Sequence, residues 1–286
     1  MTEQGEPAPK PTPPTRRSWT DLGPRVLSAL VLLPITAAAL YFGGYVFAIV
    51  VGAVFAGAYR EWETIVTLKP LSPTGGVLIG LVALSGAVFP AFGPWATLAT
   101  VGAGALISVV VGGEGAIWRV VGLLYFGCVI IATLAMRGMG DLGIWAGVFL
   151  GSVIWLTDTG AFFAGRQIGG EKLAPGISPS KTWSGAFGGW LLGTIAGLAL
   201  WIVLTDSPIW IGILLAGAMS VLGQLGDLAE SALKRHFRIK DSGDIIPGHG
   251  GLMDRLDSVT FGVLFLFLVG AFHAGIGDVA GGFLIW

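Results

Sequence analysis

Nine long apolar runs constrain this chain more than any other feature, because they occupy most of its 286 residues. A helix needs about 20 predominantly apolar residues to cross about 30 Å of hydrocarbon. The runs cover residues 26–44, 46–59, 75–92, 95–112, 118–136, 143–164, 183–204, 210–227 and 258–276. They are continuous, which excludes a β-barrel, and too numerous for a soluble α/β core. We expect an all-α polytopic integral membrane protein with about nine transmembrane helices, or eight if a short or glycine-rich run is not a span.

The lysines and arginines favour nine crossings and predict their orientation. With a cytoplasmic N-terminus, fifteen of the sixteen basic side chains fall on the cytoplasmic side and only Arg137 falls outside. Cytoplasmic loops of membrane proteins show this bias, and removing one span would scatter the charges.

The chain is expected to divide into three regions. Residues 1–24 are polar and proline-rich and predict a disordered cytoplasmic tail. Residues 25–142 are assigned to N-terminal transmembrane helices. Residues 143–286 are assigned to a C-terminal transmembrane catalytic region with cytoplasmic loops 165–182 and 228–257.

Charge is concentrated in residues 231–258, although the chain is only 12% charged. This stretch holds five basic side chains, four aspartates and two histidines between two apolar runs. Charge next to a bilayer is costly unless it serves a function. We therefore expect an anionic, metal-bound substrate at the membrane surface.

A polar face is predicted on a continuous helix over residues 210–235, which would be about 39 Å long at 1.5 Å per residue. Its members follow spacings of three, four and three: Gln224, Asp227, Ser231 and Lys234. A simple surface ion pair between Lys234 and Asp227 or Glu230 is worth a few tenths of a kcal/mol. Such a pair does not explain the alignment of the other two side chains.

Two aspartates flank the charged stretch, and we predict that they converge on one divalent cation. Asp227 ends one apolar run and Asp254 begins the next. A small number of hard oxygen ligands suits Mg²⁺, which keeps other positions for water and phosphates. Asp257 is either a further ligand or a cap at the helix N-terminus. His236 and His249 show no zinc-binding spacing.

The other predicted loop begins after Asp158, a carboxylate near the end of an apolar run. It either contacts metal or substrate, or reaches the interface and pairs with Arg166. Residues 178–182 precede an expected helix, whose N-terminus suits phosphate binding. An N-cap role explains Ser180 or Thr182 equally well, but not Lys181 at the positive end of a helix. Lys181 therefore indicates an anion site.

Glycines recur every four residues in the following run, at Gly185, Gly189, Gly193 and Gly197. This spacing places them on one helix face and predicts close packing of another helix.

These motifs resemble those of phosphatidate cytidylyltransferases, also called CDP-diacylglycerol synthases. The matching segments are Asp158–Phe162, Ile177–Thr182, Gly223–Ser231 and the polar pattern from Ser231 to Asp257. Ser180 stands where many relatives carry a second lysine, which puts that one phosphate contact in doubt. The resemblance implies that CTP and phosphatidic acid give CDP-diacylglycerol and pyrophosphate, with Mg²⁺ and a possible second cation.

The resemblance and the chemistry together suggest a role for each candidate residue. The expected catalytic residues are Asp227, Asp254, Lys234 and Lys181. The expected metal ligands are Asp227, Asp254, Asp158 and Asp257. The expected substrate contacts are Ser178, Ser180, Ser231, Arg235, Lys240, His249, Gly250, Gly251 and Arg255. His249 is either a phosphate donor or a structural loop residue.

Two other classes of membrane protein compete with this interpretation. A cation-coupled transporter predicts carboxylates in the middle of several spans, where this chain has almost none. A CDP-alcohol phosphatidyltransferase or a polyprenol kinase is another lipid enzyme, but the multi-aspartate motif of the former is absent. Nucleic acid is not an expected partner. Membrane lipids are expected partners. The glycine faces and the resemblance favour a homodimer, and the expected location is the inner (plasma) membrane.

Overall fold

The computed structural model describes residues 22–286 except 114, 244 and 247–249, and it describes side chains from residue 30 onward. The predicted tail therefore lies almost entirely outside the described residues. The helices are α1 (Leu22–Phe42), α2 (Gly44–Thr67), α3 (Pro73–Val111), α4 (Ala116–Arg137), α5 (Asp141–Gln167), α6 (Trp183–Leu204), α7 (Ile209–His236), α8 (Met253–Ala274) and α9 (Val279–Leu284). Two short strands, β1 (Lys172–Ala174) and β2 (Ser178–Thr182), and a 3-10 turn, η2 (Ile276–Asp278), complete the described elements.

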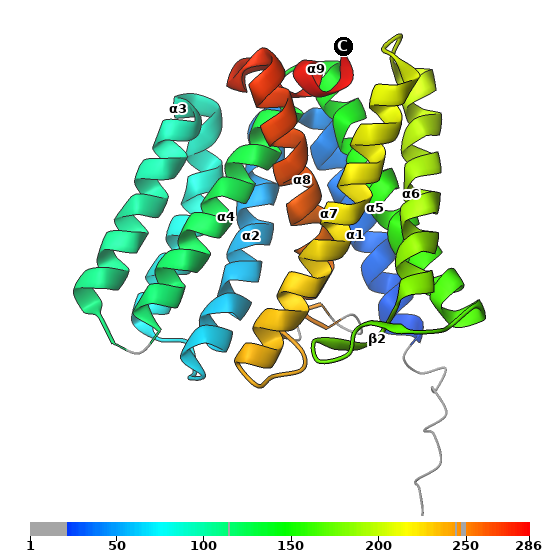
Figure 1. Ribbon diagram of the computed structural model, residues 1–286. Coiled ribbons are helices and arrows are strands. Elements are labelled where there is room, and N and C mark those ends of the chain that lie inside the picture. Colours follow the sequence, from blue (N-terminus) through cyan, green and yellow to red (C-terminus); the bar gives the residue numbers. More distant parts are fainter. Residues whose placement is uncertain (1–21, 114, 244, 247–249) are drawn as a thin grey trace, which may run out of the picture.

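Seven of the described helices, α2 to α8, are long and apolar enough to cross a membrane. The 39-residue helix α3 breaks at Gly93, whose φ of 73° favours glycine, and the break is followed by Pro94. Its two arms run side by side in opposite directions (Figure 1). They correspond to the predicted spans 75–92 and 95–112. With α1, each predicted span matches a helix or a helix arm, and the all-α membrane fold is confirmed.

Helix α2 is longer than the predicted span 46–59, because it continues through two buried carboxylates. Glu61 and Glu63 are only 3% and 1% exposed. Arg119 of α4 lies 2.6 Å from Glu63, between Nη2 and Oε1, and its Nε also donates to both carboxylate oxygens. Pairing of this kind makes burial of a charge tolerable inside a helix bundle.

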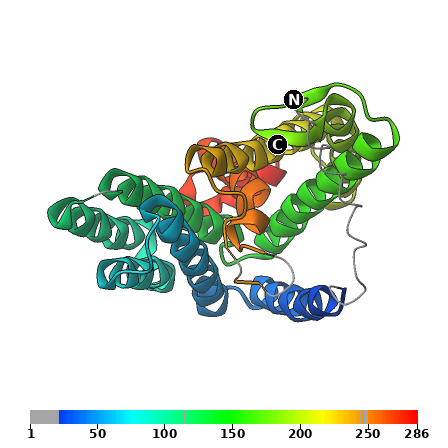
Figure 2. The ribbon, with the colours of Figure 1, turned by 90° about the horizontal axis from the view of Figure 1, so that it is seen from below.

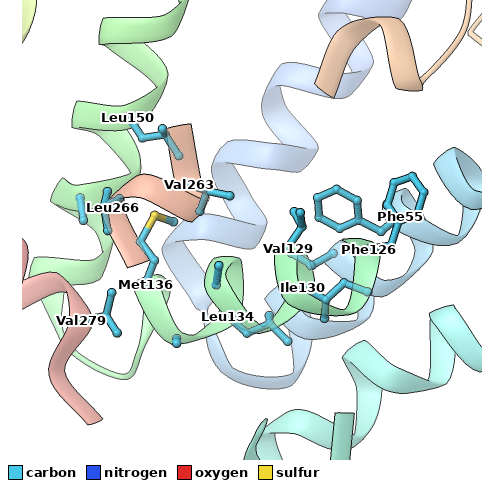
Figure 3. Close-up of a cluster of buried hydrophobic side chains, with 14 of the residues drawn as sticks. Phe55, Phe126, Val129, Ile130, Leu134, Met136, Leu150, Val263, Leu266 and Val279 are labelled. Carbon is cyan, nitrogen blue, oxygen red and sulfur yellow. The ribbon is translucent and has the colours of Figure 1, made fainter. Parts of the chain in front are cut away.

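Helix α4 lies at the centre of the hydrophobic core. The Phe126 ring packs against those of Phe55, Tyr59 and Trp62 of α2, with centroids 6.1, 5.9 and 6.1 Å away. Further along α4, Val129, Ile130, Leu134 and Met136 lie in the same buried cluster as Leu150 of α5, Val263 and Leu266 of α8, and Val279 of α9 (Figure 3). The N-terminal and C-terminal helices therefore share one core.

The connections divide between the two ends of the bundle. The β-hairpin and the described part of the 237–252 connector lie at one end, and α9 lies at the other (Figure 1). Figure 2 looks onto the end that carries the hairpin. The exceptional Arg137 is buried at the end of α4 and donates to four backbone carbonyls: Leu40, Tyr41, Gly138 and Gly140. This arginine therefore ties the last turn of α1 to the turn between α4 and α5, which gives it a structural role.

The glycine face of α6 packs against α5, as close approach of another helix requires. A Cβ added at Gly189 would lie 2.6 Å from the Thr157 carbonyl oxygen, and one added at Gly193 would lie 2.1 Å from Thr157 Oγ1. The partner helix belongs to the same chain.

Candidate functional site

A β-hairpin forms much of the predicted loop 165–182, and the sequence analysis did not anticipate it. Strands β1 and β2 pair antiparallel, with Lys172 opposite Thr182 and Ala174 opposite Ser178. Thr182 is the N-cap of α6, because its Oγ1 accepts a hydrogen bond of 3.1 Å from the Gly185 amide. The capping role thus belongs to Thr182 rather than Ser180, and Lys181 is left for other contacts.

An ion pair joins this hairpin to α7. Lys181 Nζ lies 2.6 Å from Asp227 Oδ2, and both side chains are partly exposed. Helix α7 runs without interruption from Ile209 to His236, as the spacing of its polar residues predicted. The two segments that carry the sequence motifs therefore meet at Asp227.

A cavity of about 390 Å³ opens beside this ion pair, between α5, the hairpin, α6 and α7. Its polar lining comprises Asp158, Arg166, Ser180, Lys181, Thr182, Gln224 and Asp227. Gln224 Nε2 donates to the Ala186 carbonyl across the cavity wall, at 3.3 Å. Arg166 lies over the Phe162 ring, and no ion pair between Arg166 and Asp158 occurs among the described residues. The cavity thus combines cationic and anionic groups.

Three predicted metal ligands on different helices lie within electrostatic reach of one another. Asp158 of α5 and Asp257 of α8 each interact electrostatically with Asp227 of α7. Asp257 accepts a hydrogen bond of 2.7 Å from the adjacent Ser258 amide. Arg255 is within electrostatic reach of Asp158. The negative charges of these carboxylates repel one another unless cations compensate them.

Asp254 belongs to a neighbouring cluster on α7 and α8. Lys234 Nζ contacts Asp254 Oδ1 directly and lies 3.4 Å from Glu230 Oε1. Ser242 donates to Asp254 Oδ2 through its hydroxyl at 2.8 Å and its amide at 3.4 Å. Asp254 is therefore held firmly by the chain itself.

Glu230 links the two clusters and is incompletely compensated. Both of its carboxylate oxygens are buried without a hydrogen-bond partner among the described residues. It interacts electrostatically with both Asp254 and Asp257. A buried carboxylate in this position costs free energy that a bound cation offsets.

The donor set fits a hard cation, although no complete site is preformed. In the described part of the chain, no group of three or more His, Cys, Asp or Glu side chains has the arrangement of a metal centre. Mg²⁺ needs only one or two protein carboxylates, with substrate phosphates and water filling the remaining positions. The neighbouring aspartates and the only partly compensated Glu230 are compatible with such a site.

The remaining predicted contacts belong to the hairpin, the end of α7 and the segment between α7 and α8. Arg235 donates to the Ile177 and Ile239 carbonyls at 3.2 Å and so ties the hairpin to the end of α7. Ser178 and Ser231 are half-buried, Lys240 is exposed, and Gly250 and Gly251 adjoin the start of α8. His249 lies outside the described residues. Their roles as substrate contacts stay predictions.

Sequence reasoning missed Glu61 and Ser242, which lie beside Asp254. Ser242 Oγ lies 3.4 Å from Glu61 Oε2 and 2.8 Å from Asp254 Oδ2. The available signal was the pair of glutamates directly after an apolar run, which is a costly position for a carboxylate. Ser242 gave no comparable signal.

Comparison with known proteins finds a matching family and similar proteins. The chain matches the model of the Cytidylyltransferase family over residues 23–273. It is 35% identical over 261 residues to a phosphatidate cytidylyltransferase from Brucella suis, covering 89% of this chain and 95% of that protein. It is 42% identical over 147 residues to a phosphatidate cytidylyltransferase from Bacillus subtilis, covering 51% of this chain and 55% of that protein.

Proposed function

Because the chain belongs to the cytidylyltransferase family, we infer that it is a nucleotidyltransferase acting on a membrane lipid. It transfers the cytidylyl group of CTP to phosphatidic acid in phospholipid biosynthesis. The products are CDP-diacylglycerol and pyrophosphate.

The observation that carries this proposal is the junction of a charged cavity with an apolar groove. The groove, of about 400 Å³, lies between α6 and α7. Its apolar lining includes Trp183, Phe187, Trp190, Val221, Leu225 and Leu228. Leu173, Ala186 and Gln224 line both the groove and the charged cavity. This pair of spaces suits one lipid, with its phosphate in the cavity and an acyl chain in the groove.

In the proposed reaction, an oxygen of the lipid phosphate attacks the α-phosphorus of CTP and pyrophosphate leaves. Two anions must approach each other, so positioning and charge neutralisation dominate catalysis. Lys181 and Lys234 supply cationic groups at the two carboxylate clusters. No covalent intermediate with the protein is required.

We assign bound Mg²⁺ to the carboxylates around Asp227 and Asp254, with Asp158 and Asp257 as further candidates and room for a second cation. When bound, the cation would neutralise charge that develops on the phosphate oxygens. The incomplete compensation of the buried Glu230 carboxylate supports this assignment.

The proposed location is the inner (plasma) membrane, with the N-terminus, hairpin and 237–252 connector at the cytoplasmic face. The charge bias supports this orientation. A homodimer is proposed on the resemblance alone, because the glycine face of α6 is used against α5.

Purified protein in detergent should convert CTP and phosphatidic acid to CDP-diacylglycerol and pyrophosphate, with loss of product in EDTA. CTP with Mg²⁺ should also raise the thermal midpoint, because a ligand that binds only the folded state stabilises it. A cation-coupled transporter should show neither result. Absence of lipid product and of stabilisation would contradict the proposed function.

Leu225→Trp should weaken use of long-chain phosphatidic acid, because the larger ring would fill the apolar groove. We expect the KM for a long-chain lipid to rise about tenfold, equivalent to about 1.4 kcal/mol, with little change in the KM for CTP. Leu214→Trp is the matched control, since Leu214 is also exposed on α7 but does not line the groove. Equal lipid KM values for the two variants would refute the assignment of an acyl chain to this groove.

A further inference from the structure

Glu61 of α2 is a buried carboxylate that contacts the site from the N-terminal half of the chain. We propose that Glu61 is a positioning residue for the cytidylyl transfer, holding Ser242 and the start of α8 so that the Asp254 carboxylate is correctly placed. The inference rests on the proposed function, since it assigns a role within the same site.

Glu61 caps α8 from another helix. Its Oε1 accepts a hydrogen bond of 2.9 Å from the Leu252 amide, and its Oε2 accepts one of 2.8 Å from the Met253 amide. Leu252, at the N-cap position, makes no side-chain capping bond of its own. The first amides of a helix lack partners within the helix, and a carboxylate there also interacts favourably with the helix dipole. Glu61 thereby fixes the starting point of the helix that carries Asp254.

Ser242 connects Glu61 to Asp254 more directly. The Ser242 hydroxyl lies between the two carboxylates, and its amide also faces Asp254. One hydroxyl has only one proton to donate, so the two carboxylates share a single donor. Loss of the Glu61 charge would alter both the position of Ser242 and its hydrogen bond to Asp254.

The described part of the connector approaches this carboxylate closely. A Cβ at Gly243 would lie 2.7 Å from Glu61 Oε1, and a Cβ at Gly251 would lie 1.9 Å from Ser242 Oγ and 3.0 Å from Glu61 Oε2. One turn earlier on α2, a Cβ at Gly57 would lie 2.9 Å from Leu252 Cδ2. Glycine at 243 and 251 lets the backbone approach Glu61 closely, and glycine at 57 leaves room for the Leu252 side chain against α2.

Glu63 provides a matched contrast on the same helix. It is equally buried, but its carboxylate pairs with Arg119 of α4. The described hydrogen bonds of its carboxylate all come from Arg119, its backbone carbonyl accepts one from Thr67 Oγ1, and none reaches the connector or α8. A role in stability alone therefore predicts similar effects at Glu61 and Glu63, whereas a positioning role predicts different ones.

The test compares Glu61→Gln, Glu63→Gln, Ser242→Ala and the double variant Glu61→Gln/Ser242→Ala. Glu61→Gln should lower kcat about tenfold or more, because displacements of about 1 Å cost up to about a hundredfold. The double variant should be no slower than the worse single variant, since both changes act through Asp254. Hydrogen exchange at the start of α8 should rise in Glu61→Gln and not in Glu63→Gln.

Three outcomes would overturn the inference: wild-type kcat in Glu61→Gln, multiplicative losses in the double variant, or equal kcat losses and equal exchange in the two glutamine variants. A wild-type protein that is inactive with CTP and phosphatidic acid would instead refute the proposed function. Hydrogen exchange would then still show whether Glu61 holds the start of α8.

Discussion

Asp227→Asn is expected to remove most turnover without preventing membrane insertion. Asp227 pairs with Lys181 and lies within electrostatic reach of Asp158 and Asp257, where the proposed cation binds. Asparagine keeps the shape of the side chain but not its charge. Charge stabilisation by a bound metal contributes several kcal/mol, and each loss of about 1.4 kcal/mol lowers the rate tenfold. We therefore expect kcat to fall about a hundredfold or more.

The matched control is Asp206→Asn, in the exposed connection at the opposite end of α7. Both variants should accumulate in the membrane fraction at the wild-type level. Asp254→Asn should also lose most of its activity, because Asp254 is held by Lys234 and Ser242. Near wild-type kcat in both Asp227→Asn and Asp254→Asn would refute their assignment as metal ligands.

The sequence predicted those parts of the fold that depend on local pattern. A continuous apolar run predicts a spanning helix from its length alone, and the spans on either side of Gly93 could be separated. The polar spacing from Gln224 to Lys234 predicted the uninterrupted helix α7, because residues three and four apart share a face.

Features that depend on contacts between distant residues were not predictable from one sequence. The end of α2 was placed too early, because the pairing of Glu63 with Arg119 involves another helix. The position of Asp254 depends on a hydroxyl at Ser242 and a carboxylate at Glu61, 181 positions apart in the chain. Local periodicity carries no information about such pairs.

For the site itself, the chemical type of a side chain was more informative than its expected position in a helix. Lys181 was assigned to an anion site because a cation is unfavourable at a helix N-terminus. The structure places it in β2, opposite Asp227, and assigns the helix cap to Thr182. Lys181 does pair with an anion, but that anion is a carboxylate of the chain itself.

Lys181→Met should separate activity from stability. The Lys181–Asp227 pair is partly exposed, and ion pairs of this kind contribute about 0–1 kcal/mol to folding. The thermal midpoint should therefore change little. The same ammonium group faces the charged cavity, where it would neutralise a phosphate in the transition state. Removing one such group typically lowers the rate about a hundredfold or more, so kcat/KM for CTP should fall by about that factor.

Lys172→Met is the control for this prediction, because Lys172 is exposed on β1 of the same hairpin and does not line the cavity. Lys181→Arg should restore part of the activity, since it keeps the charge but changes the geometry of the donor. If Lys181→Met and Lys172→Met lose kcat/KM equally, Lys181 contributes only general charge at the membrane surface. If Lys181→Met instead unfolds the protein while Lys181→Arg is fully active, the ion pair with Asp227 is structural. A selective loss in Lys181→Met, with partial recovery in Lys181→Arg, is the result expected of a phosphate contact.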